Sequence, residues 1–220
     1  MLFENRPDAG KRLAGQMLHL KSRHPVVLAL PRGGVPVGFE IASTLEAPLD
    51  LVLVRKIGAP GMPELAVGAI VDGEILDKVI DERMVAELGV SRTYLEAEIA
   101  RQKQEIERRR QLYLRGRPSP DLRHCTALVV DDGLATGATM RAALRAVRRR
   151  SPEHLVMAVP VAPARTMEEL RVEVDDIICL ATPEDFMAIG QFYADFHQVS
   201  DEEVIALLDQ NARLVSRWHH

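Results

Sequence analysis

The most specific stretch of this sequence reads Leu128-Val129-Val130-Asp131-Asp132-Gly133-Leu134-Ala135-Thr136-Gly137-Ala138-Thr139. Its apolar start predicts a buried strand that ends in two adjacent carboxylates, Asp131 and Asp132. Open α/β sheets bind ligands at the carboxyl ends of their strands. The small residues that follow let backbone N–H groups converge before a helix begins, and a helix N-terminus favours an anion. The stretch therefore predicts an acid pair beside a phosphate site.

One class of ligand satisfies both halves of this site. Two carboxylates would repel a phosphate that they touched, but they accept hydrogen bonds from neutral hydroxyls, so a sugar phosphate with a vicinal diol fits. Competing motifs are absent. Gly137-Ala138-Thr139 lacks the lysine of a Walker A loop, and Val130 occupies the place of a haloacid-dehalogenase aspartate. The sequence has no G-x-G-x-x-G, no nucleophile elbow and no H-E-x-x-H helix.

Apolar runs of strand length alternate with helical segments along the chain, which is the pattern of a parallel α/β sheet. Strands are predicted at about residues 26–30, 51–54, 127–130, 155–161 and 177–180, and helices at about 8–20, 39–45, 139–149, 166–172 and 204–209. No linker, repeat or low-complexity tract interrupts this alternation. The sequence favours one doubly wound, mainly parallel α/β domain.

Three segments between the second and third of these strands need separate predictions. Residues 57–63 contain two glycines and two prolines, which predicts a mobile loop rather than regular structure. Residues 66–71 and 74–77 indicate a β-hairpin. Residues 91–114 predict one long outer helix with a narrow row of apolar residues along one side. Polar residues stand at the positions where a coiled coil needs apolar ones, so a two-stranded coiled coil is not expected. Whether this helix packs on its own domain or on a second copy stays open, so a homodimer remains an alternative.

Charge and composition exclude several classes of protein. The 220 residues include 28 basic and 32 acidic side chains, for a net charge of −4, and 47% of residues are hydrophobic. Arg108-Arg109-Arg110 is interpreted as a solvated face, because acidic residues are interleaved nearby, and we expect no nucleic-acid partner. No stretch approaches the roughly 20 apolar residues of a membrane span. We expect a cytoplasmic protein without membrane contact, with Cys125 and Cys179 reduced.

Residues 129–139 resemble the signature of the type I phosphoribosyltransferases, which bind phosphoribosyl pyrophosphate (PRPP). The shared pattern is an apolar strand, two acids, three variable residues and Thr-Gly-x-Thr. The resemblance implies that Asp131 and Asp132 bind the ribose hydroxyls. It also implies that the 5′-phosphate is held by Ala135, Thr136, Gly137, Ala138 and Thr139. The family's second glycine after Thr-Gly is replaced here by Ala138, another small residue.

Leu30-Pro31-Arg32-Gly33-Gly34 resembles the family's pyrophosphate loop. Consecutive glycines expose N–H groups to an anion, and Arg32 can add a charge-assisted contact. In the family a strained, often cis, peptide lies in this loop, and whether the bond between Pro31 and Arg32 is cis or trans stays open. We therefore expect Arg32, Gly33 and Gly34 to bind pyrophosphate.

Residues 54–64 resemble the Arg-Lys-x-Gly segment and flexible loop of the adenine-type members. Arg55 and Lys56 are expected to point together at the pyrophosphate. The residues between Lys56 and Glu64 would act as a lid that excludes water. Glu64 would take a proton from a nitrogen nucleophile, with an exposed loop carboxylate as the alternative interpretation.

Aromatic residues are scarce, yet four of the eight Phe and Tyr residues fall in residues 186–196. The family covers its acceptor with a hood, here expected at about residues 183–210 plus the N-terminal helix, on a core of about 24–182 within a single domain of residues 1–220. One hood aromatic would stack on the acceptor ring, and the others would anchor the hood. The candidates are Phe186, Phe192, Tyr193 and Phe196, and a purely structural role for all four is the alternative.

The resemblance implies Mg²⁺-dependent transfer of a phosphoribosyl group from PRPP to a nitrogen base or related acceptor, with release of pyrophosphate. Asp131, Asp132, Lys56 and Glu64 are the candidate catalytic residues. No direct protein ligand to the metal is expected, because the acid pair would reach Mg²⁺ through water. A non-catalytic regulator that senses PRPP or a nucleotide is the alternative, and an acceptor other than a nucleobase also stays open.

Overall fold

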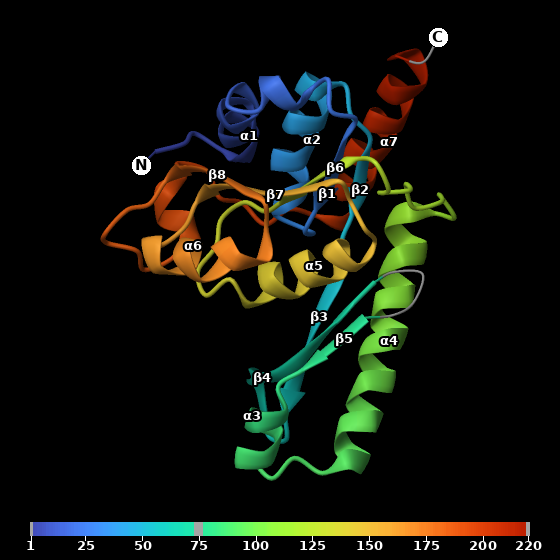
Figure 1. Ribbon diagram of the computed structural model, residues 1–220, viewed down its shortest axis with the longest axis vertical. Helices are drawn as coiled ribbons and strands as arrows, with labels where there is room; N and C mark the ends of the chain where they lie inside the picture. Colours follow the sequence, from blue (N-terminus) through green and yellow to red (C-terminus); the bar gives the residue numbers. More distant parts are fainter. Residues whose placement is uncertain (1, 73–76, 219–220) are drawn as a thin grey trace.

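Five parallel strands form the central sheet of the computed structural model, which describes residues 2–72 and 77–218 (Figure 1). In chain order these strands are β1 (Pro25–Ala29), β2 (Leu49–Leu51), β6 (Thr126–Val130), β7 (His154–Val161) and β8 (Asp176–Ala181). Most of their side chains are buried, as expected of a sheet covered on both faces. The predicted doubly wound, mainly parallel α/β fold is confirmed.

The order of strands across the sheet, β2-β1-β6-β7-β8, reverses direction between β1 and β6. The connections after these two neighbouring strands therefore leave on opposite sides of the sheet, which opens a crevice at their carboxyl ends. Ala29 pairs with Val130, and the Leu30 N–H donates to the Val130 carbonyl at 2.9 Å. Residues 31–34 and 131–139 thus start side by side.

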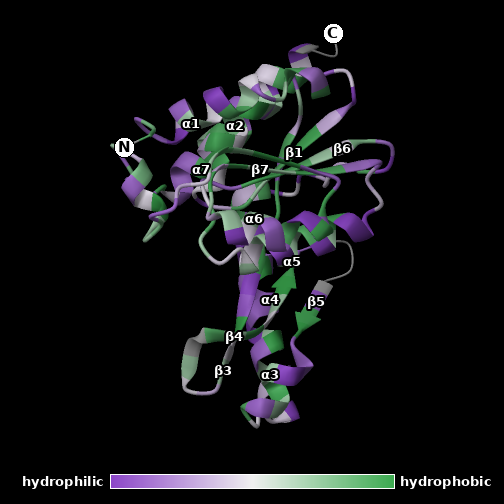
Figure 2. Ribbon diagram, turned by 60° about the vertical axis from the view of Figure 1, so that its left-hand side comes forward, coloured by the Kyte–Doolittle hydropathy of each residue, from purple (hydrophilic) through white to green (hydrophobic). Residues whose placement is uncertain are grey.

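Two layers of helices cover the sheet (Figure 1). One layer consists of α1 (Arg6–Gly15), α2 (Gly34–Leu45) and α7 (Asp201–Trp218), and the other of α5 (Ala138–Arg149) and α6 (Ala164–Leu170). Figure 2 shows strands β1 and β7 in green between helices whose outer turns are purple. The predicted helix over residues 8–20 is interrupted, because α1 ends at Gly15 and a short 3₁₀ turn, η1 (Leu18–Leu20), follows.

Helix α5 shows why the local sequence folds as it does. Met140, Ala143, Leu144 and Val147 recur at helical spacing and are buried against the sheet. On the opposite face, three arginines form ion pairs with carboxylates on or just after α6. These pairs are Arg141 with Glu169, Arg145 with Glu173, and Arg148 with Asp175.

The prediction of an irregular loop at residues 57–63 is wrong. Strands β3 (Val54–Ala59) and β4 (Met62–Val71) form an antiparallel hairpin, and β5 (Asp77–Ile80) pairs with the outer edge of β4. Gly58 lies at a register shift and Gly61 takes a left-handed turn with φ of +71°. Glycine thus supplies the bulge and the turn, while burial of Ile57 stabilises the strand. The hairpin predicted at residues 66–77 is confirmed for the described residues, and residues 73–76 lie outside them.

Together with α3 (Glu82–Glu87), this small sheet forms a lobe that projects from the core alongside α4 (Arg92–Leu114) (Figure 1). The predicted long helix is confirmed, and Ser91 caps it by accepting from the Tyr94 N–H at 3.2 Å. Helix α4 packs on β3 and α7 of its own chain. Within the described part of the chain, no helix has the length and apolar character that spanning a membrane requires.

Candidate functional site

The acid pair lies at the switch point, immediately after β6. The Asp132 N–H donates to Asp131 Oδ1 at 2.9 Å, and Asp132 is 7% exposed while Asp131 is half-buried. Burial and the adjacent Asp132 carboxylate raise the pKa of Asp131 well above its usual range. The chain therefore holds two carboxylates close together at the edge of the sheet.

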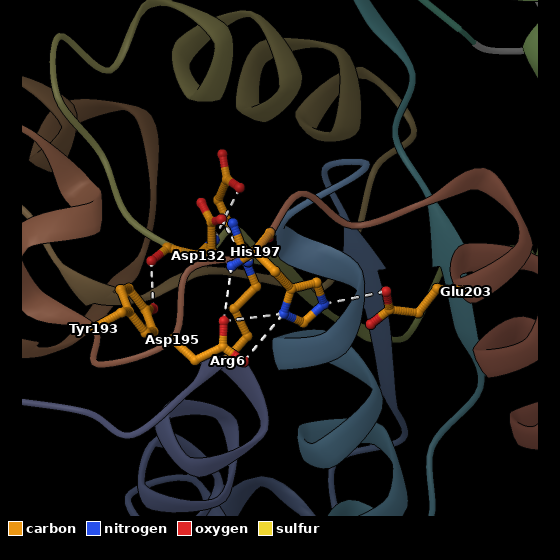
Figure 3. Close-up of polar contacts among 7 residues, drawn as sticks. Arg6, Asp132, Tyr193, Asp195, His197 and Glu203 are labelled. Carbon is orange, nitrogen blue, oxygen red and sulfur yellow. Dashed lines mark hydrogen bonds and ion pairs between the residues drawn. The ribbon is translucent and has the colours of Figure 1, made fainter.

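The Asp132 carboxylate is paired with Arg6, at the start of α1 (Figure 3). Arg6 Nε donates to Asp132 Oδ2 at 2.7 Å, and Arg6 Nη1 donates to the His197 carbonyl at 2.8 Å. The guanidinium also lies 3.8 Å from the centre of the Phe196 ring, within cation–π distance. Sequence reasoning missed Arg6, because nothing in residues 5–8 indicates a partner 126 positions away.

The predicted pyrophosphate loop touches the acid pair. A Cβ at Gly33 would lie 2.0 Å from Asp132 Oδ2, and one at Gly34 would lie 2.7 Å from the Val130 carbonyl oxygen. Both positions therefore require glycine, because any side chain would displace the acid pair or the end of β6. The peptide bond between Pro31 and Arg32 is cis.

Arg32 is oriented by a residue from α7. Its Nη1 lies 3.6 Å from Asp201 Oδ1, and both side chains are about one-third exposed. The Glu203 N–H donates to Ser200 Oγ at 3.1 Å, so Ser200 caps the start of α7. The ion pair between Arg32 and Asp201 is therefore weak, and an anionic ligand could replace Asp201 as the partner of Arg32.

The turn between β6 and α5 presents unoccupied backbone donors. Gly137 has a φ of +70°, and a Cβ there would lie 2.8 Å from Thr166 Cγ2. The Leu134 N–H donates to the Val161 carbonyl, and Thr166 Oγ1 donates to the Ala135 carbonyl. None of the described residues accepts a hydrogen bond from the backbone N–H groups of residues 135–139. These amides, at the start of a 12-residue helix, form a cradle for an anion.

The prediction that Arg55 and Lys56 point together is wrong, because consecutive residues of a strand face opposite sides. Arg55 faces α4, where its Nε donates to Gln102 Oε1 at 2.9 Å. Burial, with a smaller contribution from nearby Arg109, lowers the pKa of Arg55. Lys56 lines a cavity of about 160 Å³ between the lobe and α5, together with Thr139 of the phosphate cradle. Of the two cations, Lys56 is the one beside the cradle.

The backbone of Glu64 belongs to β4, whereas its side chain lies outside the described part of the structure. Its role as a proton acceptor stays a prediction.

The hood aromatics separate into buried and exposed members. Phe192 and Tyr193 are buried, and the Tyr193 hydroxyl donates to the Asp132 carbonyl at 2.6 Å. Phe186 is half-buried and lies 5.1 Å from Phe192, centre to centre. Phe196 is 37% exposed and stacks on Tyr193 at 5.0 Å. Two of the four candidates are therefore anchors, and Phe186 and Phe196 retain exposed surface.

The fold and this crevice define a doubly wound domain in which a pair of carboxylates lies beside an anion cradle. The chain matches the family of the phosphoribosyl transferase domain over residues 3–197, and it belongs to that family. The resemblance drawn from residues 129–139 is thereby confirmed.

Two curated relatives share 43% identity with this chain over 212 residues. Both carry the name "Putative phosphoribosyl transferase", and they come from Mycobacterium tuberculosis strains CDC 1551 / Oshkosh and H37Rv. The match covers 96% of this chain and 47% of each relative, so the chain spans about half their length. Among solved structures, TT1426 from Thermus thermophilus is 43% identical, with a TM-score of 0.82 and coverage of 96% of this chain and 99% of that one.

Proposed function

We propose that this protein transfers the phosphoribosyl group of PRPP to a nitrogen base or related acceptor and releases pyrophosphate. The observation that carries the proposal is the contact between Gly33 and the Asp132 carboxylate, one short turn before the unoccupied amides of residues 135–139. A diol, a pyrophosphate and a terminal phosphate each meet suitable groups in one crevice.

In this proposal each part of PRPP has its own binding groups. The amides of residues 135–139 hold the 5′-phosphate, the acid pair anchors the ribose, and residues 32–34 hold the pyrophosphate. The nitrogen nucleophile forms a bond to C1 while the bond from C1 to the pyrophosphate oxygen breaks, and that electron pair leaves with pyrophosphate. The carboxylates favour positive charge on the ribose, and Arg32 and Lys56 offset negative charge on the leaving group. Glu64 is the proposed acceptor of the proton released by the nitrogen.

Mg²⁺ suits this set of groups. The ion is usually held by one or two carboxylates and substrate phosphates. Over residues 2–72 and 77–218, no cluster of three His, Cys, Asp or Glu side chains could hold a metal unaided. We propose that Mg²⁺ would be held by PRPP and, through water, by Asp131 and Asp132, and that it would supply charge neutralisation at the pyrophosphate.

The acceptor is proposed to be a flat nitrogen heterocycle. Phe196 supports this, because it combines an exposed ring with a place next to Arg6 and the acid pair. The same geometry would serve a regulator that binds PRPP without transferring it.

Calorimetry with PRPP and Mg²⁺ tests the site. Asp131→Asn combined with Asp132→Asn should abolish PRPP binding, and an unchanged affinity would refute the proposal. Incubation with PRPP, Mg²⁺ and pooled bases, followed by pyrophosphate assay and mass detection of nucleotides, tests the reaction. PRPP binding without any turnover would favour the regulator.

A further inference from the structure

Helix α6 packs against the turn between β6 and α5, which carries the proposed phosphate site. The helix lies beside α5 on the same face of the sheet (Figure 1). Two of its buried side chains, Thr166 and Leu170, are one helical turn apart and both reach Gly137. A Cβ at Gly137 would lie 2.8 Å from Thr166 Cγ2 and 3.0 Å from Leu170 Cδ1. The turn therefore rests directly on one side of α6.

Thr166 also binds the backbone of this turn. Its Oγ1 donates a 2.7 Å hydrogen bond to the Ala135 carbonyl. The peptide bond between Ala135 and Thr136 is trans, so its N–H points in the direction opposite to its carbonyl. The Thr136 N–H is therefore directed away from α6, toward the side of the turn on which Thr136 is exposed. The hydrogen bond from Thr166 thus sets the direction of a donor in the phosphate cradle.

A second carbonyl of the turn is held by a different kind of partner. The Gly137 carbonyl accepts from the Arg141 N–H at 2.8 Å, so the Ala138 N–H points out from the start of α5. That hydrogen bond belongs to α5 and forms with the helix. The hydrogen bond to the Ala135 carbonyl depends instead on a side chain 31 positions along the chain. It is a contact of the cradle that a substitution outside residues 135–139 can remove.

We propose that Thr166 is a positioning residue for the 5′-phosphate site. Its hydroxyl holds the Ala135 carbonyl on the side of α6 and so keeps the Thr136 N–H directed at the phosphate. Without the hydroxyl, the carbonyl has no partner among the described residues, and rotation of the peptide lets its oxygen reach water in the crevice. An oxygen there repels a phosphate, whereas an N–H binds it. This inference rests on the proposed function and deepens it, because Thr166 lies outside the signature of residues 129–139.

Calorimetry with two probes, PRPP and pyrophosphate, each with Mg²⁺, tests the inference. Thr166→Val keeps the size of the side chain without the donor, and it should weaken PRPP binding by about fivefold or more. Its affinity for pyrophosphate should stay within about twofold of that of the unaltered protein, because pyrophosphate contacts residues 32–34 instead. Thr166→Ser keeps the donor, so its PRPP affinity should stay within about threefold. Thr44→Val is the matched control, because the exposed Thr44 also donates through Oγ1 to a backbone carbonyl, that of Glu40, and it should alter neither affinity.

Thr166→Ala keeps the test decisive if Thr166→Val does not fold, because it also removes the donor and introduces no new atoms. It should bind PRPP as weakly as Thr166→Val. The inference is overturned if Thr166→Ser loses as much PRPP affinity as the variants without a hydroxyl. It is also overturned if those variants lose pyrophosphate affinity equally, as a general loss of structure would cause, or if they bind PRPP normally. Failure of the unaltered protein to bind PRPP would overturn the proposed function, and this inference with it.

Discussion

The Tyr113 hydroxyl donates a hydrogen bond to Asp201 Oδ1 at 2.5 Å, which joins α4 to the start of α7. The same carboxylate oxygen lies 3.6 Å from Arg32 Nη1 in the predicted pyrophosphate loop. Burial and the interaction with Asp201 raise the pKa of Tyr113 to about 12, so the hydroxyl remains a donor at neutral pH. Through Asp201, the helix that supports the lobe is connected to the proposed pyrophosphate site.

Tyr113→Phe removes this donor and should lower the free energy of unfolding by about 1–3 kcal/mol, because the carboxylate loses a buried partner. It should also weaken PRPP binding about two- to fivefold, since Asp201 then holds Arg32 more strongly against the ligand. Urea unfolding and calorimetry measure the two effects. Tyr94→Phe is the matched control, because Tyr94 lies on α4 and donates to the Gly58 carbonyl; it should affect stability alone. Equal PRPP affinities for the two variants would contradict the connection.

Lys56→Ala should lower kcat/KM for PRPP by about tenfold or more, because Lys56 is the strand cation beside the phosphate cradle. Arg55→Ala should lower kcat/KM for PRPP less than Lys56→Ala does. It should lower the stability of the protein in urea more, since Arg55 supports the packing of β3 on α4 through Gln102. Steady-state kinetics and urea unfolding of both variants separate these effects. An effect of Lys56→Ala below about twofold would remove Lys56 from the mechanism.

Gly137→Ala should weaken PRPP binding by about tenfold, because the new Cβ meets Thr166 and forces the cradle out of its left-handed conformation. Gly116→Ala is the matched control. Gly116 has a φ of +80° with no atom within 4 Å of the added Cβ, so it carries similar backbone strain away from the crevice. Both variants should lose about 1–2 kcal/mol of stability. Calorimetry that finds the same PRPP affinity in both would show that the cradle does not bind the phosphate.

The parts of the site that could be predicted from the sequence are those built from neighbouring residues. Residues 128–139 carry the pattern of a strand, an acid pair, a turn and a helix start within twelve consecutive positions. Their pattern therefore predicted the fold class and the position of Asp131. Gly33 and Gly34 were identified from a short local motif, and the close approach of their backbone to the acid pair and to the end of β6 explains why glycine stands there.

The failures arose where distant packing decides the structure. Two glycines and two prolines indicated a loop at residues 57–63, but burial of Ile57 in the main core stabilises a strand there. Arg55 and Lys56 lie on the same strand, and consecutive side chains of a strand point to opposite faces of the sheet. Arg6 has no such local signal, because its role depends on a partner brought next to it by the whole fold.

Asp131→Asn should stabilise the fold while destroying the site. The raised pKa of Asp131 means that the folded state binds its proton more readily than the unfolded chain does. The associated stability is fully present below the ordinary aspartate pKa of 3.8 and is lost as the pH rises toward the pKa of the folded state. At neutral pH the Asp131 carboxyl group therefore destabilises the folded protein relative to the unfolded chain, and the neutral amide relieves this.

Thermal unfolding across pH measures the effect. The Tm of Asp131→Asn should exceed that of the original protein at pH 7, by about 2–4 °C for each kcal/mol relieved, and the gap should shrink as the pH falls toward 4. PRPP binding by the same variant should drop by about tenfold or more. Asp121→Asn is the control of opposite sign, because the exposed pair with Arg123 lowers the pKa of Asp121 to about 2. A Tm difference for Asp131→Asn that is negative or independent of pH would contradict the conclusion that the fold raises the pKa of Asp131.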